Sequence, residues 1–221
     1  MNLILQINTA LDTASVSLAQ NGNVIAESQN NTQKEHASFL QIGIREMLQT
    51  VGVSLRELSA VAVILGPGSY TGLRVGMAGA KGICFGLSIP LITVNTLEWM
   101  AGACKNKETD LVCPMIDARR MEVFLAWYSR NLEEISPPEA VILDPSSFSD
   151  IIRQKKTLFL GNGAKKFSNL ISHPNAIFII KESGAGEFAE ISWKRYQQGL
   201  FDNLAYTEPL YVKDFYTAAK Q

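Results

Sequence analysis

The chain is poor in the side chains that bind transition metals. Among 221 residues it has only two histidines, His36 and His173, and no His-x-x-x-His pair. Its three cysteines have no metal-ligand spacing, and their odd number indicates reduced, mostly buried thiols at Cys84, Cys104 and Cys113. A zinc or iron site needs three or more ligands and an open position. The sequence therefore disfavours a metal-dependent transferase or protease acting alone.

Strong charge and long apolar runs are also missing. The formal net charge is −1 and only 19% of the residues are charged. This excludes a general attraction to nucleic acid, so any RNA contact needs a local patch or a partner. No apolar run reaches transmembrane length, and no charged-then-apolar leader precedes the first apolar run at 3–5. We expect a soluble, cytoplasmic protein with a good core in one domain or two small lobes.

The most informative stretch that is present is glycine-rich and runs from Gly66 to Gly76, with the sequence GPGSYTGLRVG. It follows an apolar, strand-like run at 60–65 and opens a helix-like segment. Free N–H groups at a helix start favour an anion, so the loop is a candidate anion site with Gly68, Ser69 and Thr71 as its donors. Its spacing is neither that of a P-loop nor that of a dinucleotide fingerprint. A turn that only joins strand and helix is the alternative interpretation.

Five glycines form a stripe along the predicted helix at 72–87. They recur every three or four residues and fall within about 120° of one another on a helix: Gly72, Gly76, Gly79, Gly82 and Gly86. Arg74 and Lys81 point away from the stripe. Each interior glycine costs a helix about 1 kcal/mol relative to alanine. The stripe predicts close packing of another backbone, and two alternatives stay open: this chain's own sheet or a neighbouring helix, or else a second chain.

Hydrophobic periodicity predicts two halves with a similar order of elements, three strands followed by alternating helices and strands. The expected strands are at 3–7, 14–19, 24–26, 60–65 and 91–94, then at 111–116, 122–128, 140–143, 157–160 and 177–180. The expected helices are near 37–51, 72–87, 148–154, 165–171 and 187–198. A polar joint at 105–108 divides residues 1–105 from residues 106–221. This order predicts an α/β protein with two ribonuclease-H-like lobes, the actin-like or hexokinase-like (ASKHA) superfold.

In that superfold the turn after the first strand of each lobe usually carries an acidic residue for metal and phosphate. The matching turns here are Asn8-Thr9-Ala10 and Asp117-Ala118-Arg119. Asp117 supplies a carboxylate, whereas Asn8 brings no charge and Asp12 has the wrong offset. Because Mg²⁺ is usually held by carboxylates and substrate phosphates, Asn8 disfavours an efficient stand-alone ATPase.

Motifs along nearly the whole chain resemble those of one protein family. They are ILQINTA at 4–10, GPGSYTGLRVG at 66–76, MIDARRMEVF at 115–124, GNGA at 161–164 and PLYVK at 209–213. Together they are similar to the TsaB (YeaZ) family of the glycoprotease-like superfamily. The chain departs from the family pattern at Asn8, where aspartate is common, and at Ala10, where serine is common.

The resemblance implies a non-catalytic scaffold or activator in the complex that makes N6-threonylcarbamoyladenosine on tRNA. Such a subunit docks a TsaD-type catalytic subunit through a helical bundle, supports a TsaE-type ATPase, meets tRNA only through the complex, and forms a homodimer when alone. The bundle helices would be 37–50 and 72–87. The implied interface residues are Phe39, Gly43, Met47, Gly72, Gly76, Gly79, Gly82 and Gly86. This chain itself would require no cofactor, and ATP or ADP is expected at most at the partner interface.

Several alternatives stay open. A separate anion or nucleotide site would use Gly68, Ser69, Thr71, Arg74, Asp117 and Arg119, with Arg120 nearby, although solvated arginines are an equally good interpretation. A small-molecule kinase of the same superfold, which ATP turnover would reveal, and a protease, which casein cleavage would reveal, are the other function classes. Leucine at Gly76 or Gly79 is predicted to block docking, and Asp117→Ala to be milder. The segment 214–221 receives no assignment.

Overall fold

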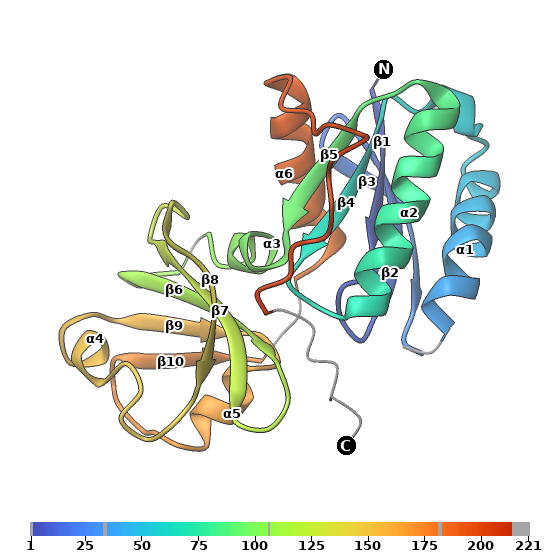
Figure 1. The fold of residues 1–221 in the computed structure, drawn as a ribbon. Coiled ribbons are helices and arrows are strands. Elements are labelled where there is room, and N and C mark those ends of the chain that lie inside the picture. Colours follow the sequence, from blue (N-terminus) through green and yellow to red (C-terminus); the bar gives the residue numbers. More distant parts are fainter. Residues whose placement is uncertain (1, 33–34, 106, 181–182, 214–221) are drawn as a thin grey trace, which may run out of the picture.

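A computed structural model gives the fold of residues 2–32, 35–105, 107–180 and 183–213. Two lobes lie side by side, each built around a five-stranded sheet (Figure 1). Within the described residues, no helix is both long and apolar enough to cross a membrane. The segment 214–221 lies outside the described residues.

The N-terminal sheet has the strand order β3-β2-β1-β4-β5. Its strands are β1 (Leu3–Asn8), β2 (Ala14–Gln20), β3 (Asn23–Asn30), β4 (Ala60–Gly66) and β5 (Leu91–Asn95). β1 pairs antiparallel with β2 and parallel with β4. The predicted hairpin between β2 and β3 is confirmed. Its turn residues Asn21 (φ 49°) and Gly22 (φ 85°) both have the left-handed backbone that a two-residue hairpin turn requires.

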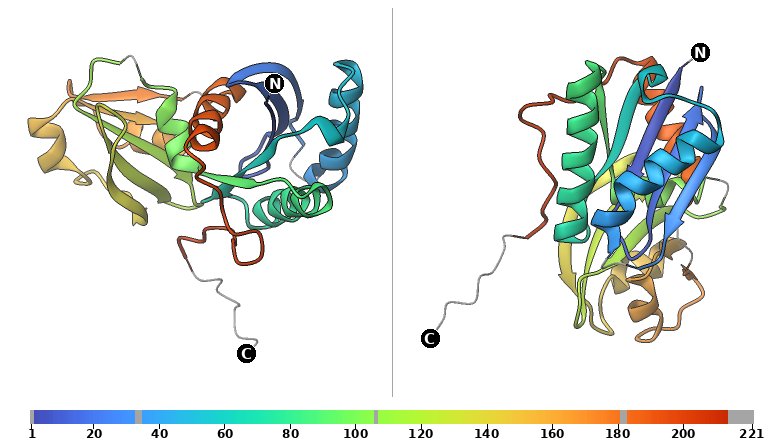
Figure 2. Two further views of the ribbon diagram at one scale, coloured as in Figure 1. Left: turned by 90° about the horizontal axis from the view of Figure 1, so that it is seen from above. Right: turned by 90° about the vertical axis from the view of Figure 1, so that its right-hand side faces the viewer.

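Helices cover both faces of this sheet (Figure 2). The helices α1 (His36–Thr50) and α2 (Tyr70–Leu87) pack on the face that includes Leu5, Val61 and Val63. The helices α3 (Thr96–Gly102) and α6 (Ala185–Gln197) pack on the other face, which includes Ile4 and Ala62. Because both faces are buried, β1 and β4 read as continuous apolar runs rather than alternating ones. A short 3-10 turn, η2 (Leu55–Glu57), leads into β4.

The C-terminal sheet repeats the topology of the first, with the order β10-β9-β6-β7-β8. Its strands are β6 (Leu111–Asp117), β7 (Glu122–Ser129), β8 (Glu134–Ile142), β9 (Thr157–Leu160) and β10 (Ala176–Ile179), with α4 (Ser149–Gln154) and α5 (Ala164–Ser168) between them. The predicted duplication is therefore confirmed. β8 begins earlier than the predicted strand at 140–143, because the edge of a sheet tolerates Pro137 and Pro138.

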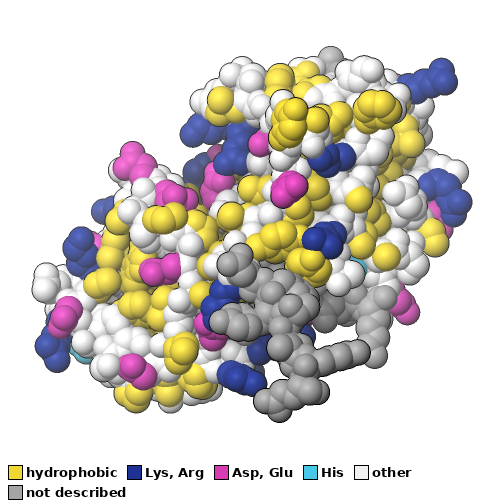
Figure 3. All heavy atoms as spheres, in the orientation of Figure 1, with side chains coloured by type: hydrophobic (Ala, Val, Ile, Leu, Met, Phe, Trp, Pro, Cys, Tyr) yellow, Lys and Arg dark blue, Asp and Glu magenta, His cyan; other side chains and the backbone are white. Residues whose placement is uncertain are grey.

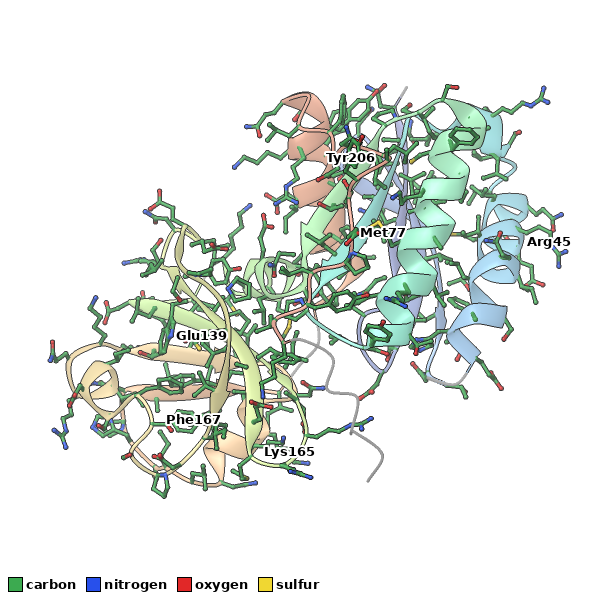
Figure 4. The ribbon with its side chains drawn as sticks, viewed as in Figure 1. Arg45, Met77, Glu139, Lys165, Phe167 and Tyr206 are labelled. Carbon is green, nitrogen blue, oxygen red and sulfur yellow. The ribbon has the colours of Figure 1, made fainter. Side chains whose placement is uncertain are left out.

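The C-terminal lobe is held by aromatic packing. Phe159 and Phe167 lie edge to face with their ring centroids 5.0 Å apart, and Phe178 stacks on Phe159 at 5.4 Å. Phe167 is fully buried and points into this core (Figure 4). A separate apolar cluster joins the two lobes, because α3 contributes Leu97 and Met100 to a core shared with strands of the second sheet. The lobes are thus packed together along one side.

The end of the chain returns to the N-terminal lobe. Gln6 in β1 donates a buried side-chain hydrogen bond to Ser192 in α6 (2.9 Å), and Asp202 pairs with Leu91 in β5. The sequence division at 105/106 assigns residues 183–213 to the C-terminal lobe, whereas α6 and Asp202 within this range pack on the first sheet. The physical reason is burial, since without α6 one face of that sheet would be exposed.

The glycine stripe of α2 is divided between two environments. A side chain at Gly72 or Gly76 would collide with Thr9, the residue after β1, and one at Gly79 would meet Leu40 of α1 at 2.7 Å. A Cβ added at Gly82 or Gly86 would meet nothing within 4 Å. The first two glycines therefore serve packing on the chain's own sheet, and the last two lie on the open side of the helix.

We expect alanine at Gly76 and alanine at Gly82 to change stability in opposite directions. A Cβ at Gly76 would collide with the Thr9 hydroxyl, so overpacking should lower the free energy of unfolding by about 1–3 kcal/mol. A Cβ at Gly82 meets open space, so better helix propensity should raise it by up to about 1 kcal/mol. Urea unfolding of both variants measures these changes. Changes of the same sign would contradict the division of the stripe into inner and outer positions.

Candidate functional site

A cleft of about 720 Å³ lies between the lobes. The N-terminal lobe contributes Ala10, Leu11, Asp12, Gly68, Ser69, Tyr70 and Thr71, and the C-terminal lobe contributes Ile116, Asp117, Ala118, Arg119, Arg120, Phe124, Asn162 and Lys166. It brings together five of the six residues predicted for an anion or nucleotide site. The ends of β1 and β6 and the start of α2 form its walls, which is where a two-lobed α/β fold of this kind presents its ligands.

On the N-terminal side, polar groups are used within the loop itself. Asn8 is buried, and its Oδ1 accepts a hydrogen bond from the Ala10 N–H (3.1 Å). The Ser69 N–H donates to the Ala10 carbonyl (2.7 Å). The Ser69 hydroxyl accepts from the Gly72 N–H (3.3 Å) as the N-cap of α2. Two donors of the glycine-rich loop are thus already satisfied by the chain, which favours the helix-capping interpretation of Ser69.

On the C-terminal side, Asp117 repeats the turn of Asn8 but carries a charge. Its Oδ1 accepts from the Arg119 N–H (2.6 Å) and from the Lys166 ammonium (2.6 Å). Its own N–H donates to Asn162 Oδ1 (2.9 Å). Arg119 (φ 71°) and Arg120 (φ 49°) follow in left-handed conformations that non-glycine residues rarely adopt. The carboxylate therefore caps its own turn and is neutralised by Lys166.

This arrangement is unfavourable for a metal ion. Among the described residues, no three His, Cys, Asp or Glu side chains lie close enough to hold one. A cation at Asp117 would have to displace Lys166, and the equivalent position in the first lobe is the neutral Asn8. His36 is buried at the start of α1, where its Nε2 lies 3.0 Å from the Asp12 carbonyl. It acts as a structural contact between α1 and the β1–β2 turn.

The sixth predicted residue, Arg74, lies outside the cleft on the exposed side of α2. Its guanidinium stands 4.2 Å from the centre of the Tyr70 ring, and its Nε donates to the Tyr211 hydroxyl (3.1 Å). The Tyr211 hydrogen bond raises the pKa of Arg74 further, so the group stays charged. The sequence motif PLYVK at 209–213 includes Tyr211, but no contact between this motif and Arg74 was predicted from the sequence.

The predicted interface residues on α1 and α2 fall into three groups. Gly43, Met47, Gly72 and Gly76 are buried; Phe39 and Gly79 are half-buried; Gly82 and Gly86 are exposed. Met47 belongs to the core under α1, and Phe39 folds over Gly43. The buried members are unavailable to a partner in this structure, because the hydrophobic periodicity that marked them is the periodicity of the core face.

The exposed face of α2 contains a residue that sequence reasoning missed. Phe85 has 80% of its surface exposed, and it lies on the same side of the helix as Ala78, Gly82 and Gly86. Ile42 of α1 is also exposed. The available signal was the spacing of 78, 82, 85 and 86, which recurs at helical intervals beside the glycine stripe. We call these four α2 residues and Ile42 the outer helix face.

Solved structures agree with the two-lobed architecture. YeaZ from Pseudomonas aeruginosa superimposes with a TM-score of 0.79 at 23% sequence identity, covering 96% of this chain and 100% of that chain. The ethanolamine utilization protein EutJ from Carboxydothermus hydrogenoformans has a TM-score of 0.50 at 10% identity, covering 87% and 90%. The fold is thus the actin-like (ASKHA) superfold, with two ribonuclease-H-like lobes and a cleft between them.

Sequence comparisons define the family. Residues 23–144 match the family model "TsaD: tRNA N6-adenosine threonylcarbamoyltransferase". The chain is 30% identical over 219 residues to the tRNA threonylcarbamoyladenosine biosynthesis protein TsaB of Escherichia coli, covering 96% of this chain and 94% of that protein. It is 31% identical over 173 residues to TsaB of Bacillus subtilis, covering 76% and 74%. The chain belongs to the TsaB (YeaZ) family, as the sequence motifs predicted.

We expect the two substitutions of Asp117 to separate its turn role from its charge. Asparagine keeps an acceptor for the Arg119 N–H and loses only a half-exposed ion pair, so it should cost less than about 1 kcal/mol of stability. Alanine also loses the turn hydrogen bond and should cost about 1 kcal/mol more. Chemical unfolding measures both, with Asp150→Ala, which removes an exposed carboxylate of α4, as the control. If asparagine and alanine are equally harmful, the charge and not the turn is what matters.

Proposed function

We propose that this chain is a non-catalytic subunit of the machinery that makes N6-threonylcarbamoyladenosine on tRNA. In this role it docks a TsaD-type catalytic subunit through the outer helix face and supports recruitment of a TsaE-type ATPase. Contact with tRNA would come through the complex, and the role implies a cytoplasmic location. Family membership supports the pathway, and the exposure of Phe85 on α2 is the single observation that supports the docking surface.

The geometry of the outer helix face suits a second helix. Ala78, Gly82 and Gly86 project little or no side chain, so a partner backbone can approach α2 closely. Phe85 stands beside them as a large apolar anchor, and burying a phenylalanine side chain contributes about 1.5–3 kcal/mol. Hydrophobic side chains gather over this part of the N-terminal lobe in the space-filling view (Figure 3). The same face would pair two copies of the chain when the partner is absent.

The cleft supports the non-catalytic part of the proposal. Asp117 is held by Lys166, and its counterpart Asn8 is neutral and buried. Phosphoryl transfer relies on side chains that hold a metal–phosphate complex and on a free base. Asn8 and the paired Asp117 provide neither. ATP or ADP at the interface with the partner, rather than in this cleft, is the corresponding proposal for a nucleotide.

Two substitutions on the outer helix face should weaken partner binding without unfolding the chain. Phe85→Ala removes an exposed anchor, and Gly82→Leu fills an open position. Each should weaken the complex with the TsaD-type protein of the same organism by about tenfold or more. Isothermal titration calorimetry measures the affinity, with Ile142→Ala, at a 72% exposed position on β8, as the matched control. Unchanged affinity in both variants would remove this face from the interface.

A turnover assay separates the subunit role from the alternative of a stand-alone small-molecule kinase or ATPase. We expect the purified chain to show no Mg²⁺-dependent ATP hydrolysis above buffer, because Asp117 is engaged by Lys166 and Asn8 lacks charge. Asn8→Asp, which restores the missing carboxylate, is the informative companion variant. Hydrolysis by the unmodified chain that Asp117→Asn abolishes would favour the kinase.

A further inference from the structure

The segment after α6, residues 198–213, runs across the molecule as a strap (Figure 1). It begins at the end of α6, passes the edge strand β5 and the side of α2, and ends beside the C-terminal lobe. None of it is helix, and its one bridge to a strand is at Asp202. An irregular segment of this length needs specific anchors to stay on a surface, and the strap has them at three places.

The first anchors attach the strap to β5 and α2. The Asp202 N–H donates to the Leu91 carbonyl (2.9 Å), and the Asp202 carboxylate accepts from the Thr93 N–H (2.7 Å). Lys81, in the middle of α2, donates to the carbonyls of Ala205 (3.3 Å) and Thr207 (3.1 Å). Lys81, which the sequence placed off the glycine stripe, thus binds the strap backbone.

The second anchor attaches the strap to the glycine-rich loop. The Leu210 N–H donates to the Leu65 carbonyl (2.8 Å), and a Cβ at Gly66 (φ 123°) would lie only 2.5 Å from the Leu210 carbonyl. The next residue, Tyr211, packs against the Tyr70 ring at 5.1 Å and accepts from Arg74. The two motifs at 66–76 and 209–213 are therefore one structural unit, and Gly66 is glycine because the strap occupies the space of its side chain.

The third anchor crosses to the other lobe. Lys213 forms an ion pair with Glu122, the first residue of β7, whose side chain is largely buried. The Glu122 carbonyl also accepts from Lys166 at the rim of the cleft (3.2 Å). The chain itself passes between the lobes twice, after α3 and before α6. The strap is a third link, and it lies at the cleft side rather than at the side packed by α3.

We infer that the strap is a conformational clamp, which fixes the first turn of α2 against the C-terminal lobe and limits opening of the cleft. Two-lobed α/β folds move by rotation about their crossover segments, and a link remote from those segments restrains this rotation most effectively. The ion pair between Lys213 and Glu122 attaches the end of the strap to the C-terminal lobe. Tyr211 attaches the neighbouring part of the strap to Tyr70 and Arg74 of α2. The inference concerns the chain alone and does not rest on the proposed partner.

Pulsed electron spin resonance between the lobes tests the clamp in the full chain. Spin labels at Gln49→Cys on α1 and Gln154→Cys on α4, both exposed, report the distance between the lobes. The native cysteines compete little for the label, because burial raises the thiol pKa of Cys84 and of Cys104 to about 11. Glu122→Gln and Tyr211→Ala should each lengthen and broaden the distribution of distances between the two labels, relative to the chain with the unmodified strap.

A control variant and a salt series make the test decisive. Tyr206 lies on the same strap between the anchors, with 83% of its surface exposed, so Tyr206→Ala should leave the distribution unchanged (Figure 4). Raising the salt concentration should shift the parent chain towards the Glu122→Gln distribution and leave Glu122→Gln unaffected, because salt screens a partly exposed ion pair. Identical distributions in all variants, with unfolding curves that show intact folds, would overturn the clamp.

Discussion

The structure depends on the close contact between the end of β1 and the first turns of α2. The Thr9 hydroxyl donates to the Gly72 carbonyl (2.7 Å), and Gly76 lies directly over the same side chain. Neither Gly72 nor Gly76 adds a side chain on this face of the helix, so α2 lies close enough to the strand end for the Thr9 hydroxyl to reach its backbone. Ser69 then caps the helix at the edge of the cleft, and the C-terminal half of α2, with Gly82, Phe85 and Gly86, contributes to the outer helix face. One packing requirement thus places both candidate functional regions.

The duplication of the fold shows how the chemistry of one turn can be removed while its geometry is kept. Asn8 and Asp117 occupy equivalent positions, and each accepts a hydrogen bond from the N–H two residues ahead. The turn therefore needs only an acceptor oxygen, which an amide supplies as well as a carboxylate. The charge is the additional property, and it is absent in one lobe and paired with Lys166 in the other. The proposed non-catalytic role is consistent with this loss of free charge at both turns.

The fold and most of the order of elements were predictable because apolar periodicity and turn residues are local signals, and here they repeat twice. The short helix α3 (Thr96–Gly102) was not predicted. Contacts between distant segments were not predictable. Nothing local in residues 183–213 shows that α6 covers the first sheet or that Tyr211 reaches Arg74. The five glycines of α2 share a stripe about 120° wide, so spacing alone could not tell that Gly72 faces β1 while Gly82 faces open space. Phe85 was overlooked because it lies outside the core pattern, and its signal is only its helical spacing from Ala78, Gly82 and Gly86.

Helix α2 is contacted on three sides by other parts of the chain, and Gly82 and Gly86 lie on the side that stays open. The sheet holds one side through Gly72 and Gly76, α1 holds the next through Gly79, and the strap holds a third through Lys81 and Arg74. A helix restrained on three sides keeps its position even though Gly82 and Gly86 each weaken it by about 1 kcal/mol. Within the described part of the chain, a Cβ added at either of these two glycines would meet nothing within 4 Å. The proposed partner helix, approaching α2 closely on this side, would supply packing at both positions, which internal contacts do not.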